Sequence, residues 1–126
     1  MTPITEIAFT CYPVIDMARA RAFYENILGL KPTMIHGSPE GPQWTEYEIG
    51  AGAFALGQAP GWNQSADGAS IAFEMEDFDA AIAELKAAGV TFKMEPFPTP
   101  VCRMAFVLDP EGNTVCIHKR HAHPNS

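Results

Sequence analysis

The first half of the chain begins with a strand pattern followed by a helix pattern. Residues 7–14 form a short run of apolar and β-favouring side chains, which predicts a strand. Over residues 17–28 the apolar positions recur at helical spacing. Asp16 stands just before this stretch, where its carboxylate can accept hydrogen bonds from the free N–H groups of the first turn. Gly29 follows at the position where a left-handed residue ends a helix at least cost. We therefore predict a helix that Asp16 caps.

A loop and a hairpin are predicted next. Residues 36–42 are rich in Pro and Gly and favour a loop. Short apolar runs at 44–49 and 53–56 flank Gly50-Ala51-Gly52, which predicts a β-hairpin. A two-residue turn would pair even-numbered with odd-numbered positions across it. A three-residue turn would instead place Tyr47 on the face that the even-numbered residues otherwise occupy.

The order of elements then begins again. Residues 59–68 contain turn residues without periodicity and predict a linker. A second capping aspartate, Asp77, lies 61 residues after Asp16 (77 − 16 = 61) and precedes a helical stretch that ends before Gly89. The strands predicted around this second helix are 70–75, 90–94, 102–108 and 114–119, with a turn over 109–113.

Each half is predicted as a strand, a helix and three strands, although only two strands are located after the first helix, and this gives an α+β fold of two βαβββ modules. A four-stranded sheet with a helix on one face leaves its other face bare, so we expect the sheets to form a shared cup-shaped cavity, with one helix covering the outer face of each. The expected organisation is one domain over residues 1–126. It comprises module 1 at about 4–58, a linker at about 59–68, module 2 at about 69–120 and a tail at 121–126.

Composition and charge exclude several classes of protein. Of the 126 residues 47% are hydrophobic and 18% charged, so the chain can bury a core. Fifteen acidic against eight basic residues give a net charge of −7, the wrong sign for nucleic acid or an anionic membrane. No segment resembles a membrane span or a secretion signal, and we expect a cytoplasmic protein. The three cysteines lack C-x-x-C spacing and are expected to be reduced.

Three segments together are similar to one known superfamily. They are Val14 to Asp16 with the helix end at 21–30, the helix between Asp77 and Gly89, and the run FVLDPEGN at 106–113. They resemble the vicinal oxygen chelate superfamily, which contains glyoxalase I, bleomycin resistance proteins and extradiol dioxygenases. The resemblance covers nearly the whole chain. It implies paired βαβββ modules, a homodimer and a cavity whose wall can hold a divalent metal.

The resemblance also locates the places where metal-dependent members carry His or Glu ligands. Counting seven residues back from each capping aspartate gives Phe9 and Ser70, and the last-strand positions fall at about Ala55 and Cys116. Phe and Ala have no donor atom, and a neutral Ser hydroxyl is a poor one. One thiolate does not make a site, and we expect Cys116 to be a small buried residue. We therefore predict no metal and no other cofactor.

Because side chains alternate across a sheet, these four positions indicate which residues face the cavity. Glu74 follows the Ser70 position by four residues, and His118 follows Cys116 by two, so both share this face. Glu74 is expected in a central strand, where a buried carboxylate needs a partner, a wet cavity or a ligand. The complete predicted wall contains Phe9, Cys11, Trp44, Glu46, Glu48, Ala55, Ser70, Ala72, Glu74, Met104, Phe106, Cys116 and His118.

Ordinary structural roles remain open for several of these residues. Glu46 and Glu48 can equally be solvated carboxylates of an edge strand, and His118 can be an exposed histidine near the end of the chain. Trp44 can be a core aromatic, although aromatics at the mouth of a cavity commonly stack on flat ligands.

Two functions fit this wall. The first is a metal-free small-molecule-binding protein that holds a flat or cationic organic ligand in an acidic cavity, as the resemblance to the bleomycin resistance branch implies. The alternative is a glyoxalase-like lyase or isomerase, or a ring-cleaving dioxygenase, whose divalent metal is held by shifted ligands. That set would be Glu46, Glu48, Glu74 and His118. A metal-free enzyme would use Glu74 as general base and His118 as proton shuttle, and would need the pKa of Glu74 to be raised.

Overall fold

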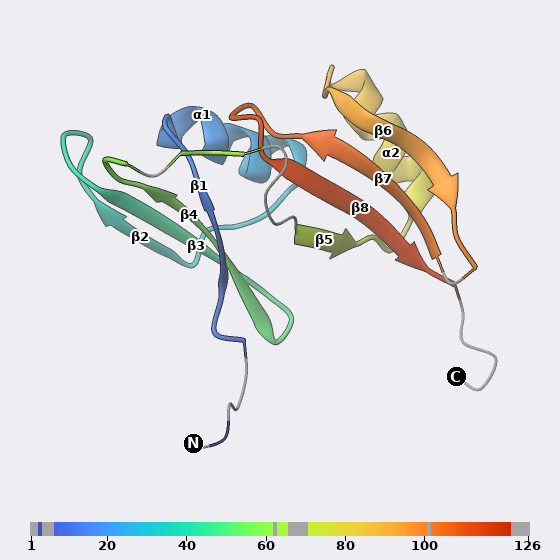
Figure 1. The fold of residues 1–126 in the computed structure, drawn as a ribbon, viewed down its shortest axis with the longest axis horizontal. Helices are drawn as coiled ribbons and strands as arrows, with labels where there is room; N and C mark the ends of the chain where they lie inside the picture. Colours follow the sequence, from blue (N-terminus) through green and yellow to red (C-terminus); the bar gives the residue numbers. More distant parts are fainter. Residues whose placement is uncertain (1–2, 4–6, 62, 66–70, 101, 122–126) are drawn as a thin grey trace. The chain divides into compact units, whose positions relative to one another are not determined.

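The computed structural model describes residues 3, 7–61, 63–65, 71–100 and 102–121 of the chain. The chain divides into two compact units, residues 1–64 (unit 1) and 65–126 (unit 2). Figure 1 labels the strands and the α-helices of both. Unit 1 contains β1 (Thr10–Pro13), α1 (Met17–Ala22), the π-helix η1 (Phe23–Ile27), β2 (Met34–Gly37), β3 (Gln43–Ile49) and β4 (Gly52–Gln58). Unit 2 contains β5 (Ile71–Glu74), α2 (Phe78–Ala87), β6 (Phe92–Pro98), β7 (Cys102–Leu108) and β8 (Thr114–Arg120).

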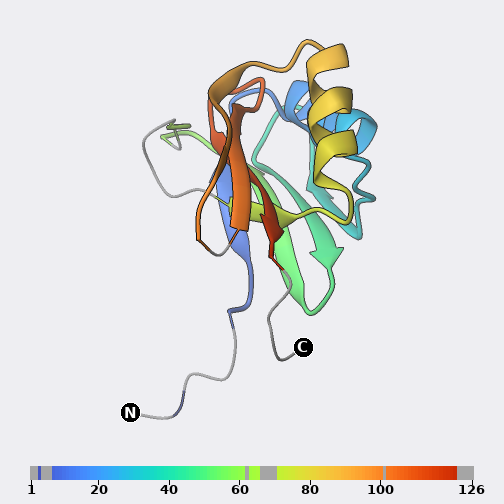
Figure 2. The ribbon, with the colours of Figure 1, turned by 90° about the vertical axis from the view of Figure 1, so that its right-hand side faces the viewer.

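Each unit is a four-stranded sheet with one helical segment. The strand orders are β1-β4-β3-β2 and β5-β8-β7-β6. β1 runs parallel to β4 and β5 runs parallel to β8, whereas the other neighbouring strands are antiparallel. Figure 2 shows α2 standing against one face of its own sheet. The predicted α+β fold of two βαβββ modules is confirmed.

The repeat extends to individual residue pairs. Cys11 pairs with Ala55 in unit 1, and Ala72 pairs with Cys116 in unit 2. Both members are displaced by the same 61 residues (11 + 61 = 72; 55 + 61 = 116), which is also the offset between the two capping aspartates. The two sheets therefore share one register of strand pairing.

Both predicted helix starts are confirmed by hydrogen bonds. The carboxylate of Asp16 accepts from Arg19 N at 3.1 Å, and that of Asp77 accepts from Ala80 N at 3.1 Å. Gly29 and Gly89, which follow the two helical segments, have φ of 76° and 75°. Left-handed residues of this kind end helices, and glycine adopts the conformation without a Cβ penalty.

The hairpin of unit 1 has a two-residue turn. Glu46 pairs with Ala55 and Ile49 with Gly52, which leaves only Gly50-Ala51 in the turn. Tyr47 consequently lies opposite Phe54 and is fully buried on the opposite sheet face from Glu46. The alternative three-residue turn is wrong.

The aromatic core of unit 1 packs on this buried face. The ring of Tyr24 lies 5.0 Å from that of Phe54, and the Tyr47 and Phe54 rings stack at 6.1 Å between centroids. In unit 2, Phe78 and Leu85 of α2 are buried, and so are Val115 and Ile117 of β8.

Three predicted boundaries are corrected. Met34–Gly37 forms strand β2, although the predicted loop began at residue 36; all four residues are exposed, so no alternation of burial existed to signal a strand. The first strand covers only Thr10–Pro13. β6 continues to Pro98, and its register shifts let an edge strand accommodate prolines.

The Asp109–Asn113 segment forms the predicted turn, and its side chains hold it together. Asp109 Oδ1 accepts from the backbone N–H of Glu111 at 2.9 Å and of Asn113 at 2.8 Å. Gly112 has φ of 88°. All three polar residues of the motif are buried, so its role in this chain is to build the β7–β8 connection.

Among the described residues, no helix has both the length and the apolar character required to cross a membrane.

Candidate functional site

The predicted wall residues of unit 1 lie on one face of its sheet. Strand pairing places Cys11, Ala55 and Glu46 side by side across β1, β4 and β3. Trp44 occupies the next even position of β3, opposite Gly57. This is the face opposite to the buried Tyr47, as the alternation predicted.

Trp44 contacts both Glu46 on its own strand and Phe9 just before β1. Its indole Nε1 donates a hydrogen bond to Glu46 Oε2 at 2.7 Å, and its ring meets that of Phe9 edge to face at 5.2 Å. Phe9 precedes β1 and Trp44 is on β3, and β4 lies between these strands. The contact between the two rings therefore spans β4, where Ala55 and Gly57 have little or no side chain to obstruct it. Both small residues are buried.

The remaining unit 1 candidates differ in accessibility. Glu48 is exposed, and Phe9 keeps 47% of its surface exposed. Burial raises the pKa of the Cys11 thiol to about 11, so Cys11 is neutral near pH 7 and is not an activated nucleophile. The accessible chemistry of this face is consequently an aromatic pair beside two carboxylates.

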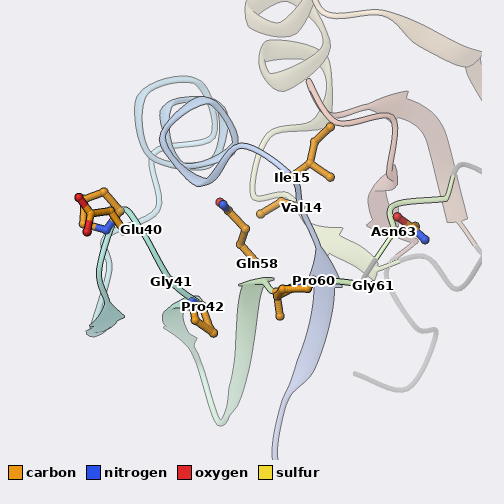
Figure 3. Close-up of a pocket in the computed structure, with 11 residues that line it drawn as sticks. Val14, Ile15, Glu40, Gly41, Pro42, Gln58, Pro60, Gly61 and Asn63 are labelled. Carbon is orange, nitrogen blue, oxygen red and sulfur yellow. The ribbon is translucent and has the colours of Figure 1, made fainter.

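Two pockets in unit 1 lie largely outside the predicted wall. Figure 3 shows the larger one, of about 460 Å³, with Ile15, Glu40, Gln58 and Asn63 among its lining residues. The smaller, of about 290 Å³, is lined in part by His36, Gln58 and Trp44. Trp44, a predicted wall residue, thus also lines the smaller of these two pockets. Sequence reasoning treated residues 39–42 and 59–63 as loop and linker, because irregular segments carry no periodic signal.

In unit 2 the predicted acid and imidazole meet. Glu74 is opposite His118 in the β5–β8 pairing, and Glu74 Oε1 lies 2.5 Å from His118 Nδ1. The second oxygen, Oε2, accepts from the backbone N–H of Arg120 at 2.7 Å. Both oxygens of this carboxylate are therefore engaged by the neighbouring strand.

The expected central strand is wrong for Glu74, and so is the raised pKa that a metal-free enzyme would need. It lies on β5, which is the end strand of its sheet rather than a central one, and its side chain is 45% exposed. Partial desolvation by itself would raise the pKa of Glu74. The hydrogen bonds from Arg120 N–H and His118 outweigh it and hold the pKa below the ordinary value of 4.5. A general base with a raised pKa is therefore not what this carboxylate provides.

The rest of the unit 2 wall is mainly apolar. Met104 is opposite His118, and Phe106 is opposite Cys116. The Phe106 ring stacks on Phe97 at 6.2 Å. Ala72 is exposed, whereas Cys116 is buried as predicted. Burial is the main cause that raises the pKa of the Cys116 thiol, and the charge of the neighbouring Cys102 adds to it. Ser70 lies outside the described residues.

The side chains at the superfamily's ligand positions do not fit a divalent metal. Phe9 and Ala55 have no donor, and the Cys116 thiol is buried with a raised pKa. Within either unit, the described part of the chain contains no group of three or more His, Cys, Asp or Glu side chains that could hold a metal ion. Glu74 and His118 provide two possible ligands, which is fewer than protein metal sites use.

Comparison with known proteins identifies the class. Residues 6–117 match the model of the Glyoxalase/Bleomycin resistance protein/Dioxygenase superfamily. The chain belongs to this superfamily, which is the vicinal oxygen chelate superfamily that its motifs resemble. A comparison with curated proteins finds no match.

Solved structures share the fold at low sequence identity. The fosfomycin resistance protein FosX from Listeria monocytogenes is 19% identical with a TM-score of 0.78, and the match covers 94% of this chain and 96% of FosX. TnmS3, an antibiotic binding protein from Streptomyces sp. CB03234, is 23% identical with a TM-score of 0.74, over 96% and 100% of the two chains. Leishmania major glyoxalase I, described as trypanothione-dependent, is 22% identical with a TM-score of 0.74, over 92% and 87%. At these identities the likeness establishes the fold alone.

Proposed function

We propose that this chain is a metal-independent small-molecule-binding protein that holds a flat, cationic organic molecule against the Phe9, Trp44 and Glu46 face of unit 1. The observation that carries the proposal is the hydrogen bond from Trp44 Nε1 to Glu46 Oε2 beside the edge-to-face Phe9 ring. It fixes an aromatic surface and a negative charge next to each other before any ligand arrives.

Each part of this face favours the same ligand chemistry. Aromatic rings attract cations through their negative faces and stack on flat molecules. The Glu46 carboxylate adds a full charge, and the net charge of −7 raises the local concentration of any cation. Because the indole already satisfies one carboxylate oxygen, the side chain loses little further freedom when a ligand binds.

Membership of the superfamily does not by itself decide between binding and catalysis, because one fold hosts many functions. The relative TnmS3 is described as an antibiotic binding protein, and FosX as a fosfomycin resistance protein. We favour binding here because the side chains at the metal-ligand positions do not fit a metal. The metal-dependent lyase, isomerase or dioxygenase is the alternative.

A pair of flat probes tests the proposal. Proflavine is a planar aromatic cation, and acridone is a neutral molecule of similar shape. We expect the wild type to bind proflavine more tightly than acridone. Glu46→Gln should weaken proflavine binding by about tenfold, equivalent to about 1.4 kcal/mol, and should leave acridone binding unchanged. Fluorescence titration measures both affinities.

The control removes the same charge elsewhere. Glu84 is an exposed residue of α2 in unit 2. Glu84→Gln changes the net charge equally and should alter proflavine affinity by less than about twofold. If proflavine and acridone bind equally, or if the two variants behave alike, the proposed cation site is wrong.

The homodimer and the cytoplasmic location also belong to this proposal. The dimer rests on the resemblance to the superfamily, and light scattering of the purified protein measures it directly. A mass equal to one 13.7 kDa chain across the micromolar range would contradict it.

A further inference from the structure

We propose that unit 2 carries a binding site of its own, in which Nε2 of His118 accepts the proton or hydrogen bond of a phenol-like hydroxyl and Glu74 is the positioning residue that orients the imidazole. This goes beyond the cation site of unit 1, and the two are tested with different probes.

The first step of the argument is that Glu74 is held in place. Its two oxygens are engaged separately, Oε1 by His118 Nδ1 at 2.5 Å and Oε2 by the Arg120 backbone N–H at 2.7 Å. The backbone is paired at the same point, because Met75 N donates to the carbonyl oxygen of His118 at 2.8 Å. A carboxylate with both oxygens engaged presents a fixed acceptor to the imidazole.

The second step concerns the proton of the neutral imidazole. A carboxylate can only accept a hydrogen bond, so the contact with Oε1 places the imidazole proton on Nδ1. The lone pair is then on Nε2. Among the residues that the structure describes, no side chain or backbone group bonds to Nε2, and 20% of the His118 side chain is exposed. Nε2 is therefore an acceptor with a set tautomer on a partly exposed side chain.

The third step is the surroundings of His118, which suit an aromatic ligand. Met104 lies directly opposite on β7, at the short side-chain separation that paired residues have. Phe97 is the β6 partner of Met104 and stacks on Phe106, the next residue on the same face. This apolar strip starts at the imidazole and can pack against a ring whose hydroxyl points to Nε2.

The fold does not require the pair. Subtracting the 61-residue repeat from Glu74 and His118 gives Pro13 and Gly57 (74 − 61 = 13; 118 − 61 = 57). Those two residues are also paired across parallel strands in unit 1. Gly57 has no side chain, so this pairing forms without a side-chain hydrogen bond. The acid and the imidazole are thus an addition to the strand pairing of unit 2 rather than a condition for it.

Proton transfer at this site breaks one bond and forms one bond. The O–H bond of the ligand breaks, a bond between hydrogen and Nε2 forms, and the oxygen keeps the electron pair as a phenolate. The resulting imidazolium retains its Nδ1–H bond to the Glu74 carboxylate, which offsets the new positive charge. No other reactant is needed.

Binding of 4-nitrophenol tests the site, because its phenolate absorbs visible light and its phenol form does not. We expect the wild type to bind it and to increase the phenolate fraction. His118→Gln should lower the affinity at least tenfold and abolish the absorbance change. His121→Gln, which removes an exposed imidazole just after β8 in the same unit, is the matched control and should leave both unchanged. Equal binding and ionisation by His118→Gln would overturn the proposal.

The tautomer of His118 distinguishes a positioning role of Glu74 from a purely structural one, because a structural role would not determine which imidazole nitrogen carries the proton. Nitrogen NMR of the wild type should show neutral His118 protonated on Nδ1, and Glu74→Gln should lose this preference while Glu74→Asp restores part of it. A wild-type His118 protonated on Nε2 would overturn the assignment without requiring any variant to fold. Glu46→Gln should not affect 4-nitrophenol, so failure of the cation site and failure of this site are distinguishable.

Discussion

Tyr47 is fully buried, yet its hydroxyl keeps a hydrogen-bond partner. It donates to Glu25 Oε2 at 2.9 Å, and Arg21 Nε contacts the same oxygen at 2.6 Å. Arg21 and Glu25 are four residues apart on the helical segment, so they meet on one face of it. The network joins that segment to β3 through polar atoms that would otherwise be costly to bury.

Removal of one hydroxyl tests this network. Tyr47→Phe keeps the ring stacking on Phe54 and deletes only the donor. We expect the free energy of unfolding to fall by about 1 kcal/mol, the usual size for a buried hydrogen bond. Urea denaturation measures it. An unchanged stability would show that the hydroxyl contributes nothing to it.

The same network predicts a pH dependence. Desolvation by itself would raise the pKa of Glu25, but the hydrogen bonds from Arg21 and Tyr47 outweigh it and hold the pKa below the ordinary 4.5. A lowered folded-state pKa contributes stability that is present above pH 4.5 and is lost as the pH falls through the folded value. Glu25→Gln should therefore lose stability at pH 7 and approach the wild type in acid. Unfolding free energies at pH 7 and pH 3 compare the two, and a constant difference would contradict the prediction.

At the scale of elements, the strongest predictions were those with a chemical cause within a few residues. The Asp16 and Asp77 caps and the two helix-ending glycines are all confirmed, because a cap requires only the first turn of its own helix. β2 was missed because all four of its residues are exposed. An exposed strand at the end of a sheet is made by backbone pairing with β3, and its side chains do not record that pairing.

The cap of α2 has a measurable effect on stability. Asp77→Ala removes the acceptor for Ala80 N and should lower the free energy of unfolding by about 1 kcal/mol. Glu76→Ala, which removes an exposed carboxylate one residue earlier, is the matched control and should have an effect within about 0.5 kcal/mol. Similar losses in the two variants would mean that charge, and not capping, accounts for the effect.

At the scale of the whole molecule, the duplication allows the chemistry of the two units to differ on one scaffold. Equivalent positions carry Pro13 and Gly57 in unit 1 but Glu74 and His118 in unit 2. The strand pairing tolerates either pair because it uses backbone atoms. The side chains on the sheet faces are consequently free to specify function.

Metal independence is the prediction that belongs to this scale. A metal present at a hundred times its Kd would add about 2.7 kcal/mol of stability, which is several degrees of melting temperature for a chain of this size. We expect neither EDTA nor added Zn²⁺, Ni²⁺ or Mn²⁺ to shift Tm by more than about 1 °C. Retention of one equivalent of metal after dialysis would favour the lyase, isomerase or dioxygenase alternative.

The sequence by itself determined the features that depend on neighbours along the chain. These are the caps, the two-residue turn as one of two alternatives, the alternation that puts Glu46 and Tyr47 on opposite faces, and the 61-residue repeat. Only the tertiary structure decided what depends on contacts between distant strands. It placed Glu74 on an edge strand of its sheet with a lowered pKa, and it brought the rings of Phe9 and Trp44 into contact across β4. The physical reason is that periodicity specifies the direction of a side chain, whereas its partners and its protonation are set by strands that the sequence separates.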